Sequence, residues 1–501
     1  MRDFTVYDLF VRNARIFSDK TAVLAHSATL TFAELLQQSE RLAAELIEQG
    51  CAQGDRIAVL AMNHPGFFVL VGAVARMGGI LVPLNWRLAE QELAYILRDC
   101  QPRLLFCDPG QEQRSQQIAE PLKIPVISLE TLVADGQVET TTTDLSPLPR
   151  DGNSPFCLLY TAAVEGVPRG ATLSHANLLG ANLQVIVSMG LGADDAHLTM
   201  LPLFHITGLN LALAVMQQGG CNVMMAKFKE DEVLRLSRQH HITLWGSFPP
   251  MLNRMIEAID QSEQQPDSLR YVVGIDGPDS IAAFERRCPA RFWILYGQAE
   301  TSGFVTFAPA SDRPGTAGRQ GPLSIFALVD ENDNPVGAGE TGEIVVRGPL
   351  VFQGYWRQDG LNARTFRNHW HHTGDLGQLD AAGYLIFKGR KPEKELIKPG
   401  GENVYPAEVE AVILQHDAIE AVSVIGVADP RFGEGVKAVC IVKPGHRLTA
   451  TELIEFVGAR IARYKKPGYV QFVDTLPMKG EVIDRQMVKK LYGQAAQPAA
   501  S

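Results

Sequence analysis

Short apolar runs alternate with amphipathic helical segments over the first hundred residues, and this alternation most restricts how the chain can fold. Residues 31–34 form a capping box that opens a helix ending at Gly50, and the run RIAVL follows. Pro65 is placed to start a second helix, Gly78 and Gly79 end it, and ILVPLN follows. This order predicts an α/β protein with mixed, largely parallel sheets covered by helices.

The length of 501 residues predicts more than one domain, because single cores rarely grow so large. Charged residues and Pro392 cluster between residues 388 and 398, just before a fresh helix at AEVEAVILQ. Such a cluster is typical of a domain hinge. Residues 145–155 are rich in Pro, Gly, Ser and Asp, which predicts a loop before the strand FCLLYT.

Charge and hydropathy argue against two classes of partner. The net charge of -10 disfavours nucleic acid, since phosphate binding needs a basic face. No apolar run reaches the roughly 18 residues that a membrane helix needs, and no signal peptide is visible. Seven scattered cysteines without a CxxC pair indicate free thiols in a reducing, cytoplasmic setting.

The segment LLYTAAVEGVPRGATLSHANL contains a glycine loop. A strand is expected to end at Thr161, a loop with Gly166, Pro168 and Gly170 follows, and a helix begins near Ser174. A loop between strand and helix can present backbone N–H groups to phosphate, although an ordinary connection would look the same.

Four further residue patterns could carry chemistry. His205 in LPLFHITGLN is either structural or catalytic, and Glu300 after the buried run FWILYG could hold Mg²⁺ on a nucleotide or cap a helix. Asp375 follows a glycine in a predicted tight turn, and its two oxygens suit a ribose diol. Gly400 and Gly401 would let a ligand approach the backbone closely.

In this order and spacing, the segments resemble the superfamily of acyl-CoA synthetases, peptide-synthetase adenylation domains and luciferases. The most specific pieces are GEIVVRGPLVFQGYW, HTGDLG and PGGENVYPAEVE. The resemblance implies an AMP- and acyl-binding domain over residues 1–390, a small mobile C-terminal α+β domain over 391–493 and a disordered tail over 494–501. It also implies that a carboxylate attacks the α-phosphate of ATP, and that the small domain then rotates before a thiol, usually CoA, takes the acyl group.

The resemblance further implies roles for individual residues. Asp375 would bind the ribose hydroxyls with Arg390 nearby, and Tyr296 would lie against the adenine. Glu300 would hold Mg²⁺, and His205 would line the acyl pocket beside the reacting carboxylate. The remaining assignments are Thr161, Gly166, Arg169, Gly277 and Gly297 for the nucleotide, Lys394 for the hinge and Gly401 for the pantetheine tunnel.

Four positions depart from the family pattern, among them the adenine segment, which reads GIDGP at 274–278 instead of GGAP, and Ala299, which replaces the threonine before Glu300. The phosphate loop, usually YTSGTTGxPKG, reads YTAAVEGVPRG, which removes hydroxyl donors, adds Glu165 and keeps a cation at Arg169. At the C-terminus, where the family has PxTxxGKIxR, Val482 occupies the lysine position. Lys479 is the nearest substitute, although it could equally be a solvated surface lysine.

Three functions follow as hypotheses. The first is an ATP-dependent acyl-CoA ligase for a fatty or aryl acid, using Mg²⁺, with a pocket lined by His205, Trp245, Phe248 and Tyr296. The second is an adenylating enzyme that loads a separate carrier protein. The third is a catalytically weakened binder of acyl nucleotides or CoA. A homodimer is left open.

Overall fold

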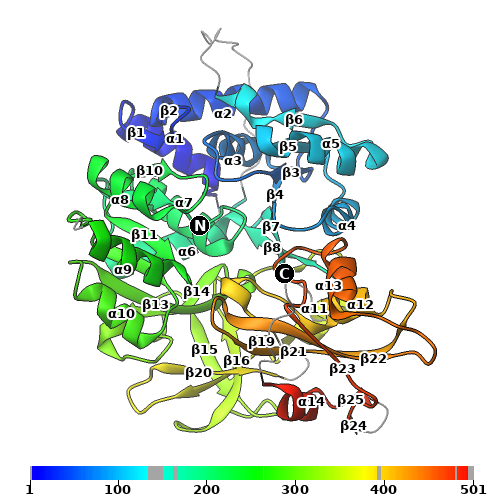
Figure 1. Cartoon of the computed structure of the whole chain (residues 1–501). Helices are drawn as coiled ribbons and strands as arrows, with labels where there is room; N and C mark the ends of the chain where they lie inside the picture. The colour runs from blue at the N-terminus through cyan, green and yellow to red at the C-terminus, as the bar shows by residue number, and fades with distance from the viewer. Residues whose placement is uncertain are drawn as a thin grey trace.

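The computed structural model describes residues 3–133, 151–161, 167–262, 265–391, 396–479 and 482–494 (Figure 1). Two large mixed sheets dominate the N-terminal part. The first has the order β14 (Gly303–Pro309), β13 (Arg291–Gln298), β12 (Tyr271–Gly274), β11 (Leu244–Ser247), β9 (Ala196–Thr199), β10 (Cys221–Met224), β1 (Thr21–Leu24) and β2 (Thr29–Thr31). Its interior pairs are parallel and its two outer pairs are antiparallel.

The second large sheet repeats this plan. Its order is β17 (Gly354–Tyr355), β8 (Arg169–Ser174), β7 (Pro155–Thr161), β4 (Ile80–Leu84), β3 (Arg56–Leu60), β5 (Leu104–Cys107) and β6 (Val126–Ser128). Strands β7, β4, β3, β5 and β6 are parallel, whereas β8 and β17 are antiparallel to their neighbours. The prediction of mixed, largely parallel sheets is therefore confirmed for both.

Helices cover these sheets and fill the space between them. They are α1 (Val6–Ile16), α2 (Phe32–Glu48), α3 (Gly66–Met77), α4 (Glu90–Cys100), α5 (Glu112–Ala119), α6 (His175–Met189), α7 (Ile206–Gln217), α8 (Glu230–Gln239), α9 (Met251–Ser262), α10 (Pro278–Glu285) and α11 (Asp359–Thr365). Every residue of α3 is buried, and one apolar core joins it to α2, α6, α7 and strands of both sheets. Thr31 accepts a hydrogen bond from the backbone of Glu34, as the capping box predicted.

A third, antiparallel sheet carries the segment HTGDLG. It contains β15 (Ile325–Val329), β16 (Thr341–Arg347), β19 (Trp370–Leu379), β18 (Phe366–Arg367) and β20 (Leu385–Arg390). Asp375 was expected in a tight turn, but it lies within β19, directly opposite Arg390 of β20. Gly374, which precedes Asp375 in β19, has φ +71°, a backbone conformation that glycine adopts without steric cost.

The C-terminal part has its own apolar cores. It consists of α12 (Pro406–Ile413), β21 (Ile419–Asp429), β22 (Gly433–Val442), α13 (Ala450–Gly458), β23 (Tyr469–Phe472), the hairpin β24 (Met478–Lys479) and β25 (Val482–Ile483), and α14 (Arg485–Tyr492). This confirms a small C-terminal α+β domain. The boundary at residue 390 remains a prediction, and the predicted tail lies almost wholly outside the described residues.

The predicted strand–loop–helix around the glycine loop is wrong in one respect. RGATLS forms β8, which pairs antiparallel with β7, so the loop joins two strands, whereas the helix predicted to begin near Ser174 does form, as α6 from His175. Alternating residues of RGATLS face two packed layers, and that burial outweighs the glycine signal at Gly170. Residues 162–166 of the loop, including Gly166, lie outside the described part.

All seven cysteines are unpaired, as predicted, and all but Cys221 are buried. Burial raises the pKa of the Cys221 thiol to about 11 and that of Cys440 to about 12.

Gly297 gives a stability prediction, because the register of β13 on β14 shifts between it and Tyr296. A Cβ at Gly297 would lie 1.6 Å from the carbonyl oxygen of Gly303. We expect Gly297→Ala to lower the free energy of unfolding by about 1–3 kcal/mol, as overpacking does. Gly277→Ala is the control, since a Cβ there meets nothing within 4 Å, and it should cost less than about 1 kcal/mol. If urea unfolding showed the same loss of free energy of unfolding for both variants, the predicted clash at Gly297 would be wrong.

Candidate active site

Asp375 is the centre of a buried polar cluster. Only 2% of its surface is exposed, and its Oδ2 accepts hydrogen bonds from the Tyr296 hydroxyl at 2.8 Å and from Gln298 Nε2 at 2.7 Å. Its Oδ1 lies 3.0 Å from Nε of Arg390 but accepts no hydrogen bond among the described residues. Burial and the negative charge of Asp375 raise the pKa of Tyr296, so its hydroxyl stays a donor. This buried carboxylate keeps acceptor capacity for a ribose hydroxyl.

Glu300 forms a second acidic position, close in sequence to Tyr296. It lies in the short 3₁₀ turn η4 (Ala299–Thr301) directly after β13. The Tyr355 hydroxyl donates to its Oε1 at 2.9 Å, and Thr161 Oγ1 lies 3.4 Å from the same oxygen. The guanidinium of Arg169 lies 5.9 Å from the Tyr355 ring centroid. Three residues predicted to bind the phosphates and the metal thus converge around one tyrosine.

The C-terminal part closes the site from the other side. Arg390 Nη1 donates to the Tyr405 hydroxyl at 3.3 Å. Glu402 Oε1 lies 2.8 Å from Nη1 of Arg87, and its Oε2 lies 3.7 Å from Nε2 of His205. Burial opposes the charge on Glu402, but the hydrogen bond and charge of His205 lower its pKa below the usual value.

His205 lies at the N-terminus of α7 with 46% of its side chain exposed. Its ring is 4.5 Å from that of Phe204, which in turn faces the guanidinium of Arg87 at 5.6 Å. His205 therefore lies at the contact between the two parts of the chain, and its predicted place in the acyl pocket beside the reacting carboxylate stays a prediction.

The other predicted residues lie in varied places. Trp245 is fully buried in the apolar core and packs against Phe284, whereas Phe248 is half-buried after β11, and the place of both in an acyl pocket stays a prediction. Lys479 is exposed on β24, at the lower end of Figure 1 beside α14. Gly401 ends the 3₁₀ turn η7 (Pro399–Gly401) next to Glu402. Lys394 lies outside the described residues.

Four residues of the site were not predicted from the sequence: Gln298, Tyr355, Glu402 and Tyr405. Each lies in a segment already singled out, within YGQAE, GYW or GGENVYP. The available sequence signal was that each is an aromatic or polar residue close to one with a predicted role. Their contacts depend on long-range pairing, which local pattern does not reveal.

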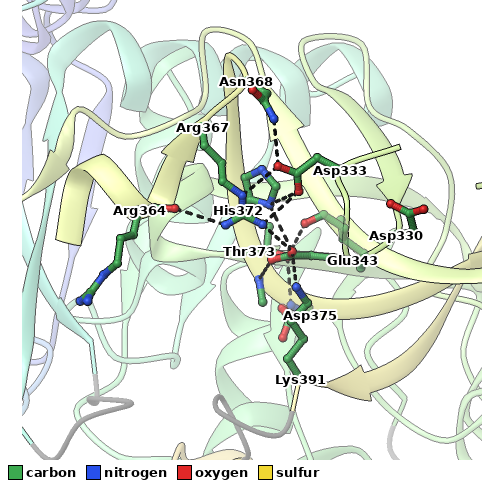
Figure 2. Close-up of polar contacts among 12 residues, drawn as sticks. Asp330, Asp333, Glu343, Arg364, Arg367, Asn368, His372, Thr373, Asp375 and Lys391 are labelled. Atoms are coloured by element: carbon green, nitrogen blue, oxygen red, sulfur yellow. Dashed lines mark hydrogen bonds and ion pairs between the residues drawn. The ribbon is translucent and has the colours of Figure 1, made fainter. Parts of the chain in front are cut away.

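A charged network around Glu343 lies next to Asp375 and includes Lys391, the residue after β20 (Figure 2). Glu343 of β16 is 4% exposed and accepts hydrogen bonds from Lys391 Nζ at 2.7 Å and from the backbone N–H of Gly374 at 2.9 Å. His372 Nδ1 lies 3.1 Å from the same carboxylate. Arg367 joins the network through Asp333, with Nη2 at 3.0 Å and Nε at 2.9 Å from its two oxygens. Glu343 therefore fixes both the backbone before Asp375 and the residue after Arg390.

Sequence comparison gives two matches along the chain. The AMP-binding enzyme family matches residues 10–356, and the AMP-binding enzyme C-terminal domain matches residues 408–481. The chain belongs to the AMP-binding enzyme family.

Relatives in this family match almost end to end. An indoleacetate–CoA ligase from Aromatoleum aromaticum is 34% identical over 93% of this chain and 94% of its own length. A fatty acid–[acyl-carrier-protein] ligase from Streptomyces coeruleorubidus is 31% identical over 95% of this chain and 94% of its own. Similarity across both domains places this AMP-binding enzyme among the AMP-forming acid–thiol ligases.

Two structures of one AMP-binding enzyme, o-succinylbenzoate CoA synthetase from Bacillus subtilis, differ in their likeness to this chain. A double mutant bound to a product analogue, OSB-NCoA, has a TM-score of 0.87 at 25% identity, covering 98% of both chains. The complex with the acyl-adenylate OSB-AMP has a TM-score of 0.71 at 26% identity, covering 100% of this chain and 99% of that one. As a whole, the chain therefore superposes more closely on the product-analogue complex than on the acyl-adenylate complex.

Two absences concern only the described part of this AMP-binding enzyme. None of its helices there is long and apolar enough to span a membrane. The same residues contain no group of three or more His, Cys, Asp or Glu side chains that could hold a metal. A cation at Glu300 would therefore need further ligands from a bound nucleotide.

We expect Asp375→Asn to weaken AMP binding by about 10-fold or more, because a charge-assisted bond to a hydroxyl is lost. It should also lower the free energy of unfolding by roughly 3 kcal/mol, since Arg390 keeps its charge without a partner. Calorimetry with AMP and urea unfolding measure the two effects.

Asp380→Asn is the matched control for this change. Asp380 pairs with Arg313 at 2.7 Å on an exposed turn after β19, and its loss should leave AMP affinity unchanged. Unaltered AMP affinity in Asp375→Asn would show that the ribose site lies elsewhere.

Glu343 predicts a specific dependence of stability on acid. Burial opposes its charge, yet the hydrogen bonds of His372 and Lys391 and the charge of Lys391 lower its pKa from 4.5 to about 2. A depressed pKa stabilises the fold above pH 4.5, and this contribution is lost as pH falls toward 2. At pH 7 the free energy of unfolding of the wild type should exceed that of Glu343→Gln by roughly 3 kcal/mol. This difference should become smaller below pH 4.5.

Urea unfolding at several pH values checks this expectation. Glu340→Gln, at an exposed turn before the same strand, should show no comparable gap. A gap for Glu343→Gln that stays constant from pH 7 to pH 3 would mean that its cause is packing and not charge.

Proposed function

We propose that this AMP-binding enzyme is an ATP-dependent ligase that activates an apolar fatty or aryl acid as an acyl-adenylate and transfers it to CoA. The observation that carries the proposal is the cluster around Asp375: Tyr296 and Arg390 contact its carboxylate, and Arg390 in turn donates to Tyr405 of the C-terminal part. A buried carboxylate beside two aromatic hydroxyls and a guanidinium suits a nucleoside with a phosphate nearby. Relatives named for indoleacetate and for a fatty acid support the acid class.

In the first step an acid oxygen would attack the α-phosphorus of ATP, and the bond to pyrophosphate would break. Asp375 would hold the ribose, Arg169 would face the phosphates, and a Mg²⁺ held by Glu300 and the phosphates would supply charge neutralisation. Both hydrogen bonds on Glu300 fall on Oε1, which leaves Oε2 as a ligand among the described contacts. His205 would border the reacting carboxylate.

In the second step the thiol sulfur would attack the acyl carbon and AMP would leave. The turn that contains Gly401 lies beside Glu402, which contacts both Arg87 and His205, so a pantetheine arm reaching the acyl carbon would pass this turn. A hinge at Lys394, a homodimer and a cytoplasmic location remain predictions.

The alternative acceptor is a separate carrier protein, which the relative named as an acyl-carrier-protein ligase favours. A weakened, binding-only protein is the other alternative. The motivation is the altered phosphate loop and Val482, together with the exposed position of Lys479 on β24. Lys479 could act only after the small domain turns.

The test measures pyrophosphate release by the purified chain with ATP, Mg²⁺ and a panel of aryl and fatty acids. Release that depends on the added acid is expected, followed by a thioester with free CoA. Release without CoA thioester, but with acylated carrier protein, would favour the second function. Absence of acid-dependent release with every acid would refute both enzymatic proposals.

The same assay separates the two readings of Lys479. If it replaces the missing lysine, Lys479→Ala should slow adenylation about 10²-fold and spare thioester formation from supplied acyl-AMP. Lys443→Ala, another exposed lysine of the C-terminal part, is the control. An unchanged adenylation rate would leave Lys479 as a surface residue.

A further inference from the structure

Lys465 is a buried cation shared by the two parts of the chain. Only 1% of its side chain is exposed. Its Nζ lies 2.6 Å from Oε1 of Glu92 on α4 and 2.8 Å from Oε2 of Glu408 on α12. Glu92 belongs to the N-terminal part, whereas Lys465 and Glu408 belong to the C-terminal part. One ammonium group therefore joins carboxylates that are more than 300 positions apart in sequence.

The second oxygen of Glu92 strengthens the same junction. Its Oε2 accepts hydrogen bonds from the backbone N–H of Ala89, which caps α4, and from the backbone N–H of Ala462 at 2.9 Å. Ala462 is buried in the apolar core beside α4, and Tyr464 packs against that core. In Figure 1, α4 is drawn above α13, the helix that precedes Ala462 and Lys465 in the chain. A single carboxylate thus contacts both the backbone and a side chain of the C-terminal part.

The charges make the junction specific to this arrangement. Burial raises the pKa of Glu408, but Lys465 opposes that effect and stabilises its charge. Within the C-terminal part, Lys465 and Glu408 form a neutral pair that can persist when Glu92 is absent. Glu92 adds a second carboxylate, and this contact exists only while α4 faces Lys465.

The junction is linked to the active site through one short segment. Glu408 Oε1 accepts a hydrogen bond from the backbone N–H of Tyr405 at 2.9 Å. Tyr405 in turn meets Arg390, and Glu402 of the same segment meets His205. Fixing Glu408 therefore fixes the residues that close the site.

We propose that Glu92 is a positioning residue for the thioester-forming step, which it serves by completing the Glu92–Lys465–Glu408 triad that holds the C-terminal part against the active site. The inference rests on the proposed function. The higher likeness to the product-analogue complex than to the acyl-adenylate complex supports the assignment of this arrangement to the second step. The triad should therefore be absent while the acyl-adenylate forms.

The test compares Glu92→Gln with Glu90→Gln, a change at an exposed carboxylate in the same helical turn. Glutamine can still accept from the backbone N–H groups, but it offers no charge to Lys465. In Glu92→Gln, thioester formation from supplied acyl-AMP should slow by about 10-fold or more, as the loss of one coupling contact predicts. Acid-dependent pyrophosphate release should change by less than about 2-fold, because binding groups at the nucleotide are untouched. Glu90→Gln should change neither rate.

Two further measurements distinguish loss of the triad from a general loss of stability and from failure of the proposed function. In a Lys465→Met background, adding Glu92→Gln should slow thioester formation little further, because both changes remove the same contact. Small-angle X-ray scattering should show a less compact particle for Glu92→Gln, whether or not the enzyme is active. Equal slowing of both half-reactions, or scattering identical to that of the wild type, would overturn the triad. Wild-type protein without acid-dependent pyrophosphate release would instead overturn the proposed function.

Discussion

The pairing of β19 with β20 is the constraint on which the site depends. It places Asp375 opposite Arg390 and buries the ion pair between them, which costs free energy unless both groups find further partners. Tyr296 and Gln298 supply such partners from the end of the first large sheet. The antiparallel third sheet and the mixed first sheet must therefore meet where these residues lie. Glu343 stabilises this arrangement by accepting hydrogen bonds from the backbone of Gly374 and from Lys391.

Local signals predicted much of the scaffold. The capping box at Thr31, the helix ended by Gly78 and the buried strand before Glu300 all form as expected, because each depends on neighbours within a few residues. The strand β8 was missed, since its pairing with β7 outweighs the turn signal of its glycine. Sequence alone does not say which face of β11 meets the core; Trp245 lies in that core, and its place in a pocket stays a prediction.

The site was predictable only as far as its motifs extend. Asp375, Arg390 and Tyr296 come together as the family pattern implied. The contacts that close the site could not be foreseen, because they join segments hundreds of residues apart: Glu402 with Arg87, and Lys465 with Glu92. Such pairs depend on how the C-terminal part docks, and no local rule of propensity or periodicity encodes docking.

The buried state of the cysteines has a practical consequence for watching the two parts move. A thiol reacts as its thiolate, and burial both hides the sulfur and keeps the proton on it. Even the half-buried Cys221 has its pKa raised to about 11. Maleimide dyes at neutral pH would therefore find poor targets in the native chain. A cysteine engineered on the surface of each part could carry a donor and an acceptor fluorophore, and energy transfer between them would report the domain arrangement during turnover.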